Sequence, residues 1–337
     1  MKISRRQLVG GAAVAAVSTA FASTEAHAAE FNYKLGNSTP VDHPFNKRLF
    51  EASKQVLEET NGRLNIQIFP NSELGGDNDL LSQVRSGAVQ FFPGAGLILA
   101  SVLPVIGIDG MGFAFPSYKQ VWAAMDGDLG AYVKKQIVAH TDLVPLDTMW
   151  DLGYRQITNS VRPITKASDL VGMKLRVPGA PPLVSMFQAL GVSPVSMQFG
   201  EVYTALQTKV VDGQENPLSQ IDSGKFYEVQ KYLSLTNHVW DGFWMVANGP
   251  AWKRLPPDIQ AVVNKVFTEK SLQERGDLVA LNAGLVDQLK SKGMTVNQPD
   301  TESFRAKLHD AGFYTEWKKK MGDEAWTLLE TYTGKLA

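Results

Sequence analysis

Cysteine is absent from this chain of 337 residues, and neither sign of charge dominates it. The absence of cysteine excludes disulfides, thiolate catalysis and thiolate metal sites. A formal net charge of −1 leaves no basic excess, so nucleic acid is not an expected partner. The HExxH, GxSxG and CxxC motifs of common metalloenzymes, hydrolases and redox proteins are missing as well. We therefore expect no cofactor and no enzyme activity, although a hydrolase stays open as the rival class.

Long hydrophobic runs are also scarce, and the one that stands out lies near the N-terminus. The run Leu8–Ala22 follows the pair Arg5-Arg6 and precedes the small-residue stretch Ala26-His27-Ala28. About 15 small and apolar residues are too few to span a bilayer comfortably. The pattern is typical of a cleaved secretory signal, and the paired arginines indicate the twin-arginine route. We predict that residues 1–28 are removed and that the remaining chain works in the periplasm.

The exported part alternates strand and helix patterns. Hydrophobic residues make up 44% of the chain, which is typical of a globular protein. This part is long enough to bury a large core without disulfides. Strand and helix patterns alternate in the order strand 31–36, helix 44–59, strand 64–69, helix 77–86 and strand 89–92. The order predicts parallel strands joined by right-handed crossovers, and the length predicts an α/β fold of two lobes.

The later part of the chain continues the alternation and contains one unusually long helix pattern. We expect strands at 144–150, 173–177 and 239–246, and helices at 117–139, 182–190, 202–210, 301–321 and 323–332. The pattern from 256 to 290 is interrupted only by Gly276 and Gly284. A helix of that length is rare in a globular protein.

The stretch Gly172–Pro178 predicts a short strand that ends in an arginine site. Apolar residues alternate with Lys174 and Arg176, and Pro178 terminates the strand. A guanidinium at the strand end is always charged and presents a planar fork that matches a carboxylate. Taken alone, the stretch is more typical of a surface strand that carries two solvated cations.

Three further motifs lie on either side of this strand in the sequence. They are GYRQ at 153–156, FGEVY at 199–203 and DGQENP at 212–217. Together with LRVP at 175–178, they make the chain resemble the solute-binding proteins of TRAP (tripartite ATP-independent periplasmic) transporters, the DctP-type family. The resemblance covers nearly the whole exported chain.

The resemblance implies a fold, a division into lobes and a function. The fold is the two-lobed periplasmic binding protein fold, type II-like, with a long helix that spans both lobes. Lobe I would comprise 29–152 plus 242–281, and lobe II would comprise 153–241 plus 282–337. The protein would capture an organic acid by an arginine–carboxylate pair and close around it. The partners would be a small organic acid and the membrane subunits of the transporter.

The resemblance also assigns the binding residues. Arg176 would hold the solute carboxylate, Arg155 and Asn216 would donate hydrogen bonds to it, and Phe199 would pack on the solute carbon body. Pro178, at the end of the LRVP strand, would lie beside this site. Structural alternatives stay open: Arg155 as a buried structural cation, Asn216 as a turn residue and Phe199 as part of the core.

Departures from the best-known branch of the family bear on the solute. Asn78, Ala95 and Phe243 stand where sialic-acid binders use an arginine, a glutamate and a glutamine. A site without those polar partners would leave solute hydroxyls unpaired, so sialic acid is not expected. Because Trp240 and Phe243 share one strand, we expect an apolar pocket. The predicted solute is an aromatic or otherwise apolar monocarboxylate.

One alternative solute class remains. A small hydroxy, keto or sugar acid would place its hydroxyl groups on Asp77, Asp151 or Asp241. The rival reading, a periplasmic hydrolase, requires a nucleophile and base that the sequence does not present.

Overall fold

A computed structural model describes residues 29–336, so the predicted signal at 1–28 lies outside the described residues. The first lobe follows the predicted order of strands and helices, and β1 pairs in parallel with both β2 and β3, as predicted. Its elements are β1 (Phe31–Gly36), α1 (Pro44–Glu59), β2 (Leu64–Phe69), α2 (Asp77–Ser86), β3 (Phe91–Ala95), α3 (Gly96–Leu99), η1 (Pro104–Gly110), α4 (Tyr118–Met125) and α5 (Asp128–His140).

Local sequence explains the clearest of these elements. Helix α1 has Pro44 at its first position, where the missing N–H costs nothing. His43 caps this helix, because its Nδ1 accepts a hydrogen bond from the backbone N–H of Phe45 at 3.2 Å. Phe45, Leu49, Ala52 and Val56 are buried on one face, at helical spacing. His43 is therefore a capping residue.

The second lobe carries the motifs that define the site. Its elements are η2 (Ala167–Leu170), β5 (Lys174–Val177), α6 (Pro181–Ala189), β6 (Ser193–Ser196), η3 (Phe199–Glu201), α7 (Val202–Gln207), β7 (Gly213–Pro217), α8 (Leu218–Ser223), η4 (Phe226–Glu228), β8 (Tyr232–Ser234) and β10 (Thr295–Asn297). Strand β5 pairs in parallel with β6 and β7. Arg176 on β5 therefore lies beside Gln214 on β7.

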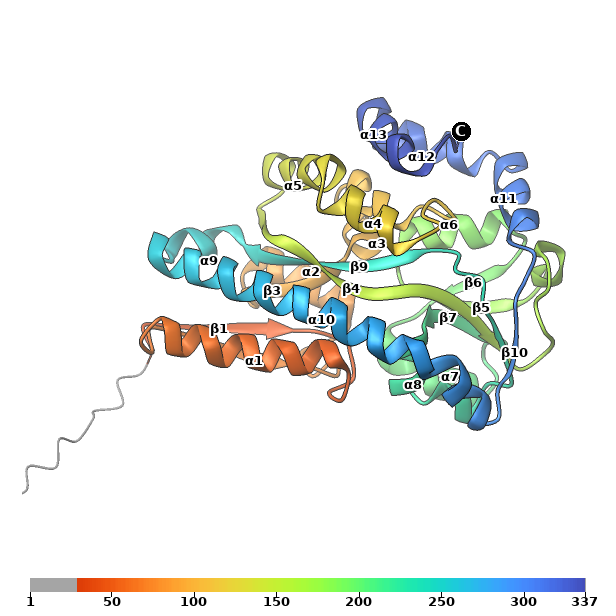
Figure 1. Ribbon diagram of the computed structural model, residues 1–337, viewed down its shortest axis with the longest axis horizontal. Helices are drawn as coiled ribbons and strands as arrows, with labels where there is room; N and C mark the ends of the chain where they lie inside the picture. The colour runs from red at the N-terminus through yellow and green to blue at the C-terminus, as the bar shows by residue number, and fades with distance from the viewer. Residues whose placement is uncertain (1–28, 337) are drawn as a thin grey trace, which may run out of the picture.

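Two strands join the lobes: β4 (Leu143–Asn159) and β9 (Trp240–Asn248). The strands of residues 29–336 form one ten-stranded sheet (Figure 1). Eight of them follow the order β2-β1-β3-β9-β4-β7-β5-β6, and the other two branch from the central strand β4, which pairs with β8, which in turn pairs with β10. The predicted strand 144–150 was too short. Strand β4 is 17 residues long in all. It passes through a register shift between Asp151 and Gly153, and Gly153 has φ +109°. Its second half is buried on both faces, which hides the alternation that reveals a strand.

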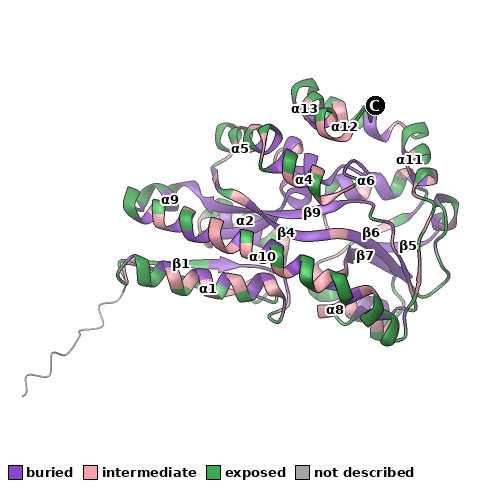
Figure 2. Cartoon of the chain, in the orientation of Figure 1, coloured by how far each residue is buried: buried purple, intermediate pink, exposed green. Residues whose placement is uncertain are grey.

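The long helix α10 (Pro257–Ser291) spans both lobes, as predicted. It contacts α1 of the first lobe, the shared strand β4, and α8 and β10 of the second lobe. Figure 2 shows exposed residues along its outer side and buried residues where it meets the strands. Within residues 29–336, no helix has the length and apolar character needed to cross a membrane.

The remaining helices are α9 (Gly249–Arg254), α11 (Thr301–Asp310), α12 (Phe313–Met321) and α13 (Asp323–Thr333). The predicted single helices 117–139 and 301–321 were wrong. The first is divided at Gly127, which caps α5, and the second at Gly312, which adopts φ +73°. Helix α13 packs on α4 and α5, while α12 packs on α6. The C-terminal helices thus touch elements assigned to both lobes, and the lobe boundaries stay a prediction.

Candidate functional site

A cavity lies between the lobes, and most of the predicted site residues line it. These are Asp77, Ala95, Arg155, Arg176, Pro178, Phe199, Asn216 and Phe243. The sequence did not assign five further lining residues, which are Ser38, Leu97, Ile98, Leu152 and Gln220. Asp241 also lines the cavity and was named only for the alternative solute class. The structure thus brings together residues from distant parts of the chain.

Trp240 and Asn78 are the predicted site residues that do not line the cavity. Alternation along β9 sends Asp241 and Phe243 toward the cavity and Trp240 to the other face. The indole Nε1 of Trp240 donates to Asp151 Oδ1 at 2.9 Å, so Asp151 is also engaged away from the cavity. Asn78 instead lies against Gly179, on the opposite lobe.

Arg176 is a buried cation that faces the cavity without a carboxylate partner among the described residues. Its side chain is 2% exposed. Nε and Nη2 both donate to the backbone oxygen of Met197, at 3.0 and 2.7 Å. Burial, reinforced by the nearby Arg155, lowers the pKa of Arg176 to about 10, so the group remains charged at neutral pH. A carboxylate in the cavity would supply the direct ion-pair partner that Arg176 lacks.

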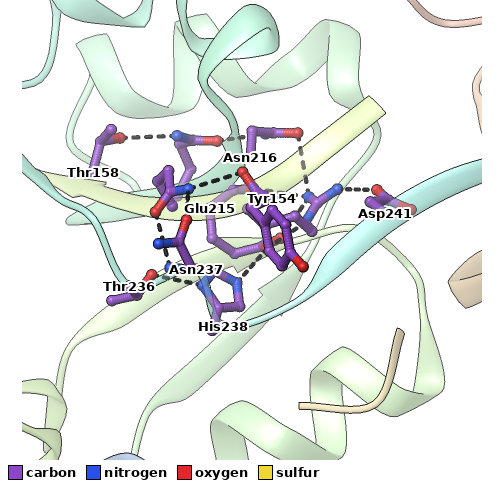
Figure 3. Close-up of polar contacts among 11 residues, drawn as sticks. Tyr154, Thr158, Glu215, Asn216, Thr236, Asn237, His238 and Asp241 are labelled. Atoms are coloured by element: carbon purple, nitrogen blue, oxygen red, sulfur yellow. Dashed lines mark hydrogen bonds and ion pairs between the residues drawn. The ribbon is translucent and has the colours of Figure 1, made fainter. Parts of the chain in front are cut away.

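Arg155, in contrast, is already paired. Its Nε donates to Glu215 Oε2 at 2.5 Å, its Nη2 donates to Glu215 Oε1 at 2.8 Å, and its Nη1 donates to Asp241 Oδ2. Nη2 also lies 3.2 Å from Asn216 Oδ1 (Figure 3). Burial opposes the charge of Arg155, but the two carboxylates overcome this effect and raise its pKa. Arg155 is thus held rigidly in a buried ion cluster while it lines the cavity.

Glu215 was also not assigned from the sequence, although it belongs to the QENP motif itself. It is fully buried, and His238 Nε2 donates to its Oε2 at 3.0 Å, since an ionised carboxylate only accepts. His238 Nδ1 lies 2.7 Å from Thr236 Oγ1. Burial alone would raise the pKa of Glu215, but Arg155 and His238 lower it to about 2. Glu215 therefore stays ionised and orients Arg155.

Two buried oxygens at the cavity have no hydrogen-bond partner. They are Oδ1 of Asp241 and Oε1 of Gln220. The Nε2 of Gln220 reaches Thr39 Oγ1 of the first lobe at 3.4 Å. Asp77 is partly satisfied, because its Oδ1 accepts from the Ser38 hydroxyl at 2.7 Å. The lining of the cavity therefore combines the Arg176 cation with oxygens that can accept hydrogen bonds.

The lobes are in contact along one edge of the cavity, which we call the seam (Gly76, Asn78, Gly179 and Gln198). A Cβ built on Gly179 would lie 2.4 Å from Asn78 Nδ2. A Cβ built on Gly76 would lie 2.3 Å from Gln198 Oε1. Both glycines therefore permit a close approach of the two lobes. Among residues 29–336, no group of three histidine, aspartate or glutamate side chains is arranged to hold a metal ion.

A two-lobed α/β fold whose central cavity carries a buried arginine open to an anion defines a binding protein for small anionic solutes. Comparison with known proteins specifies the family. Residues 35–319 match the model of bacterial extracellular solute-binding proteins, family 7 (DctP), and the chain belongs to this family.

Curated relatives and solved structures agree with this assignment. A solute-binding protein of Roseobacter denitrificans is 35% identical over 90% of this chain and 93% of its own length. The 2,3-diketo-L-gulonate-binding periplasmic protein of Escherichia coli is 30% identical over 85% of this chain and 84% of its own length. The structure of a TRAP periplasmic solute-binding protein from a Polaromonas species, bound to D-erythronate, superposes with a TM-score of 0.84. It is 31% identical and covers 91% of this chain and 99% of that chain.

Membership of this family confirms the predicted class of protein. The chain is a solute-binding protein of the TRAP transport class, and its family is periplasmic. The family consists of substrate-binding proteins and not of enzymes, so the rival hydrolase reading is wrong.

Proposed function

We propose that this protein captures a short hydroxylated carboxylic acid, a hydroxy acid or sugar acid, and delivers it to the membrane subunits of a TRAP transporter. One observation carries the proposal. The residues that line the cavity include the unpaired Arg176 cation together with Asp241 and Gln220, each of which has a buried oxygen without a hydrogen-bond partner. A carboxylate on Arg176 and hydroxyl groups on these oxygens would satisfy every one of these groups.

The predicted aromatic or apolar monocarboxylate is not supported. That prediction depended on a cluster of aromatic side chains, but only Phe199 and Phe243 among the predicted aromatics line the cavity. The ring of Phe243 also packs on the ring of Phe45, with 5.1 Å between the ring centroids. This contact holds the Phe243 ring in the wall of the cavity. An apolar solute would leave the cavity oxygens unpaired, at a cost of about 1–3 kcal/mol each. The hydroxy-acid alternative fits these side chains better.

Solutes named for similar proteins support the same class. The Polaromonas protein was bound to D-erythronate, and a structure of the Roseobacter relative, 32% identical with a TM-score of 0.83, holds L-galactonate. Both solutes combine one carboxylate with several hydroxyl groups. For this chain we propose Arg176 as the carboxylate site. Asn216 and the Arg155 cluster would complete it, Phe199, Ala95 and Pro178 would shape the wall, and Asp77 would lie at the hydroxyl end.

Export remains part of the proposal. We propose that residues 1–28 act as a twin-arginine signal and that the mature protein meets its transporter in the periplasm. Closure follows from the two lobes, since a solute that touches both favours the closed state by its differential contacts.

A thermal-shift screen of the exported chain tests the solute class. Aldonic and other hydroxy acids are expected to raise the unfolding midpoint, because a ligand that binds only the native state stabilises it. The gain is about 2.7 kcal/mol at a hundredfold excess over Kd. Benzoate and aryl keto acids serve as matched carboxylates without hydroxyl groups and are expected to give no shift. Shifts only with the aromatic acids would contradict the proposed solute class, and silence with all carboxylates would contradict the function.

The seam gives a second expected result. In this structure Gly179→Ala places a methyl group against Asn78 of the other lobe, and Gly179 has no left-handed φ that would strain an alanine. We expect opening of the lobes to relieve this contact. Overpacking costs about 1–3 kcal/mol, so the affinity for a hydroxy acid should fall about 5- to 150-fold while the free protein keeps its unfolding midpoint.

A second substitution tests whether the seam is the cause. Asn78→Ala removes the side chain that the new methyl group meets, so Gly179→Ala combined with Asn78→Ala should regain affinity in calorimetric titrations. Gly276→Ala is the control, because a Cβ there meets no atom within 4 Å. Unchanged affinity in Gly179→Ala would show that closure does not require the seam.

A further inference from the structure

The cavity between the lobes carries more negative than positive charge. Arg155 and Arg176 line it together with Asp77 and Asp241, and the buried Glu215 is paired with Arg155. Two positive and three negative groups give a formal charge of 2 − 3 = −1. A bound monocarboxylate would bring the total to −2 in a space closed off by both lobes. Buried charge without compensation is expensive, by several kcal/mol per ion.

Neighbouring titratable groups do not supply the missing positive charge. His238 touches Glu215, but burial lowers the pKa of His238, so it is neutral at pH 7. Asp109, on η1 behind Gly96, is fully buried, and burial together with the nearby Asp241 keeps its pKa well above the usual range. Glu201 approaches the site from the Arg176 side and is exposed. Any compensation must therefore come with the solute or from one of the cavity carboxylates.

We infer that the solute anion is captured together with one proton, which resides on Oδ1 of Asp241. The inference rests on the proposed function and specifies how that site accepts an anion. The proton comes from solvent and returns to solvent when the lobes open and the solute leaves. No bond other than the O–H bond forms or breaks.

The geometry selects Asp241 among the cavity carboxylates. Its side chain is 2% exposed; Oδ2 is bound to Arg155, while Oδ1 is buried and unpartnered. Glu215 is held ionised by Arg155 and His238, and Asp77 accepts a hydrogen bond from Ser38.

The charges that face Asp241 favour the same choice. They come from Arg155 on β4, Glu215 on β7, Asp77 on α2 and Asp109 on η1, and Arg176 lines the same cavity. Burial raises the pKa of Asp241 to about 6, with Arg155 opposing the shift and Glu215 and Asp77 adding to it. A solute anion adds one more negative charge beside it, which raises this pKa further.

The proton also gives the cavity complementary hydrogen-bonding groups. A protonated Oδ1 donates to a hydroxyl or keto oxygen of the solute, while Oε1 of Gln220 accepts from a solute hydroxyl. A hydroxyl group can serve both partners, because it donates and accepts. The pair would thus recognise a hydroxy acid at its hydroxyl end while Arg176 holds its carboxylate.

The test uses calorimetric titration of the exported chain with D-erythronate and L-galactonate between pH 5.5 and 8.5. Below the pKa of free Asp241 the proton is already present, so Kd should be constant. Above it the complex binds more protons than the free protein, and Kd should rise by up to about tenfold per pH unit. Titrations at pH 7.5 in buffers with different heats of ionisation should report the uptake of close to one proton.

Two matched variants locate the proton. Asp241→Asn removes the titrating group, so its Kd should lose the rise with pH and the proton uptake should vanish. Asp77→Asn should keep both the pH dependence and the uptake, whatever its Kd. A pH dependence that survives in Asp241→Asn and disappears in Asp77→Asn would overturn the assignment to Asp241. The wild-type proton count needs no variant and stands even if a variant fails to fold.

Other outcomes separate this inference from the function itself. Binding with the same Kd at every pH and no proton uptake would overturn the inference and leave the proposed function in place. Binding that requires sodium and is lost in N-methylglucamine buffer would also overturn it, since a metal cation would then balance the charge. A Kd for amino acids that is lower than the Kd for the two hydroxy acids and does not change with pH would also overturn the inference. No binding of either acid at any pH would contradict the proposed function.

Discussion

Arg176→Ala is expected to abolish solute binding while leaving the protein folded. The guanidinium is the cavity cation that lacks a carboxylate partner among the described residues, so its charge is available to the solute. Two charge-assisted hydrogen bonds at about 1.5–3 kcal/mol each amount to about 3–6 kcal/mol, or about 10²- to 10⁴-fold in Kd. Calorimetric titration with the best hydroxy acid measures this loss, and circular dichroism checks the fold.

Arg176→Lys and Arg176→Met separate charge from geometry. Lysine keeps a positive charge but replaces the planar fork by a point charge, so most of the affinity should still be lost. Methionine removes the charge at similar length. Because burial disfavours the Arg176 charge in the empty cavity, the free Arg176→Met protein should unfold at a midpoint close to that of the wild type. Near-normal affinity in Arg176→Lys would contradict the bidentate arrangement, and normal affinity in Arg176→Met would exclude Arg176 from the site.

The sequence predicted the regular elements best where one face alone is buried. Strand β1, helix α1 and strand β2 have the predicted bounds, because period 2 or period 3.6 is legible in their apolar residues. The second half of β4 was missed because residues on both of its faces are buried. The break between α4 and α5 depends on the cap at Gly127, a local signal that the apolar pattern of the two helices conceals.

Which residues line the cavity could be predicted only in part. Family motifs located Arg176, Asn216 and Phe199, and these residues do share one cavity. The character of the pocket could not be predicted, since it depends on which face of β9 points inward. Alternation alone allowed either Trp240 or Asp241 to face the cavity, and pairing with β4 selected Asp241. Because Asp241 faces the cavity, the part of the cavity proposed to contact the solute hydroxyl groups is polar.

The partner of Arg155 was missed for a different physical reason. A sequence shows that a cation and a carboxylate are both present, but not that a strand pairing brings them together. Antiparallel pairing of β4 with β7 places Ile157 opposite Glu215 and Arg155 opposite Pro217, so the two charged side chains share one side of the sheet. Arg155 is therefore both a lining residue and the buried structural cation that was considered as an alternative.

Glu215→Ala is expected to destabilise the fold more than any other single substitution at the site. Glu215 is fully buried and accepts two side-chain hydrogen bonds from Arg155 and one from His238. Removal of one partner of a buried ion pair leaves an uncompensated charge and costs about 3–5 kcal/mol. For a chain of this size the midpoint of thermal unfolding should fall by on the order of 10 °C. Denaturant unfolding gives the free energy directly, and the exposed Glu73→Gln is the matched control.

The pH dependence shows whether the ion pair causes this loss. The pKa of Glu215 is lowered from 4.5 to about 2 in the folded state, so its stabilising effect is fully present above pH 4.5. As the pH falls toward 2 the folded state gains the proton and that effect disappears. The difference in unfolding free energy between the wild type and Glu215→Gln should therefore shrink from pH 5 to pH 3, while Glu73→Gln tracks the wild type throughout. A difference that stays constant over this range would mean that Glu215 stabilises the fold by packing, and that Arg155 is held in place by Asp241 alone.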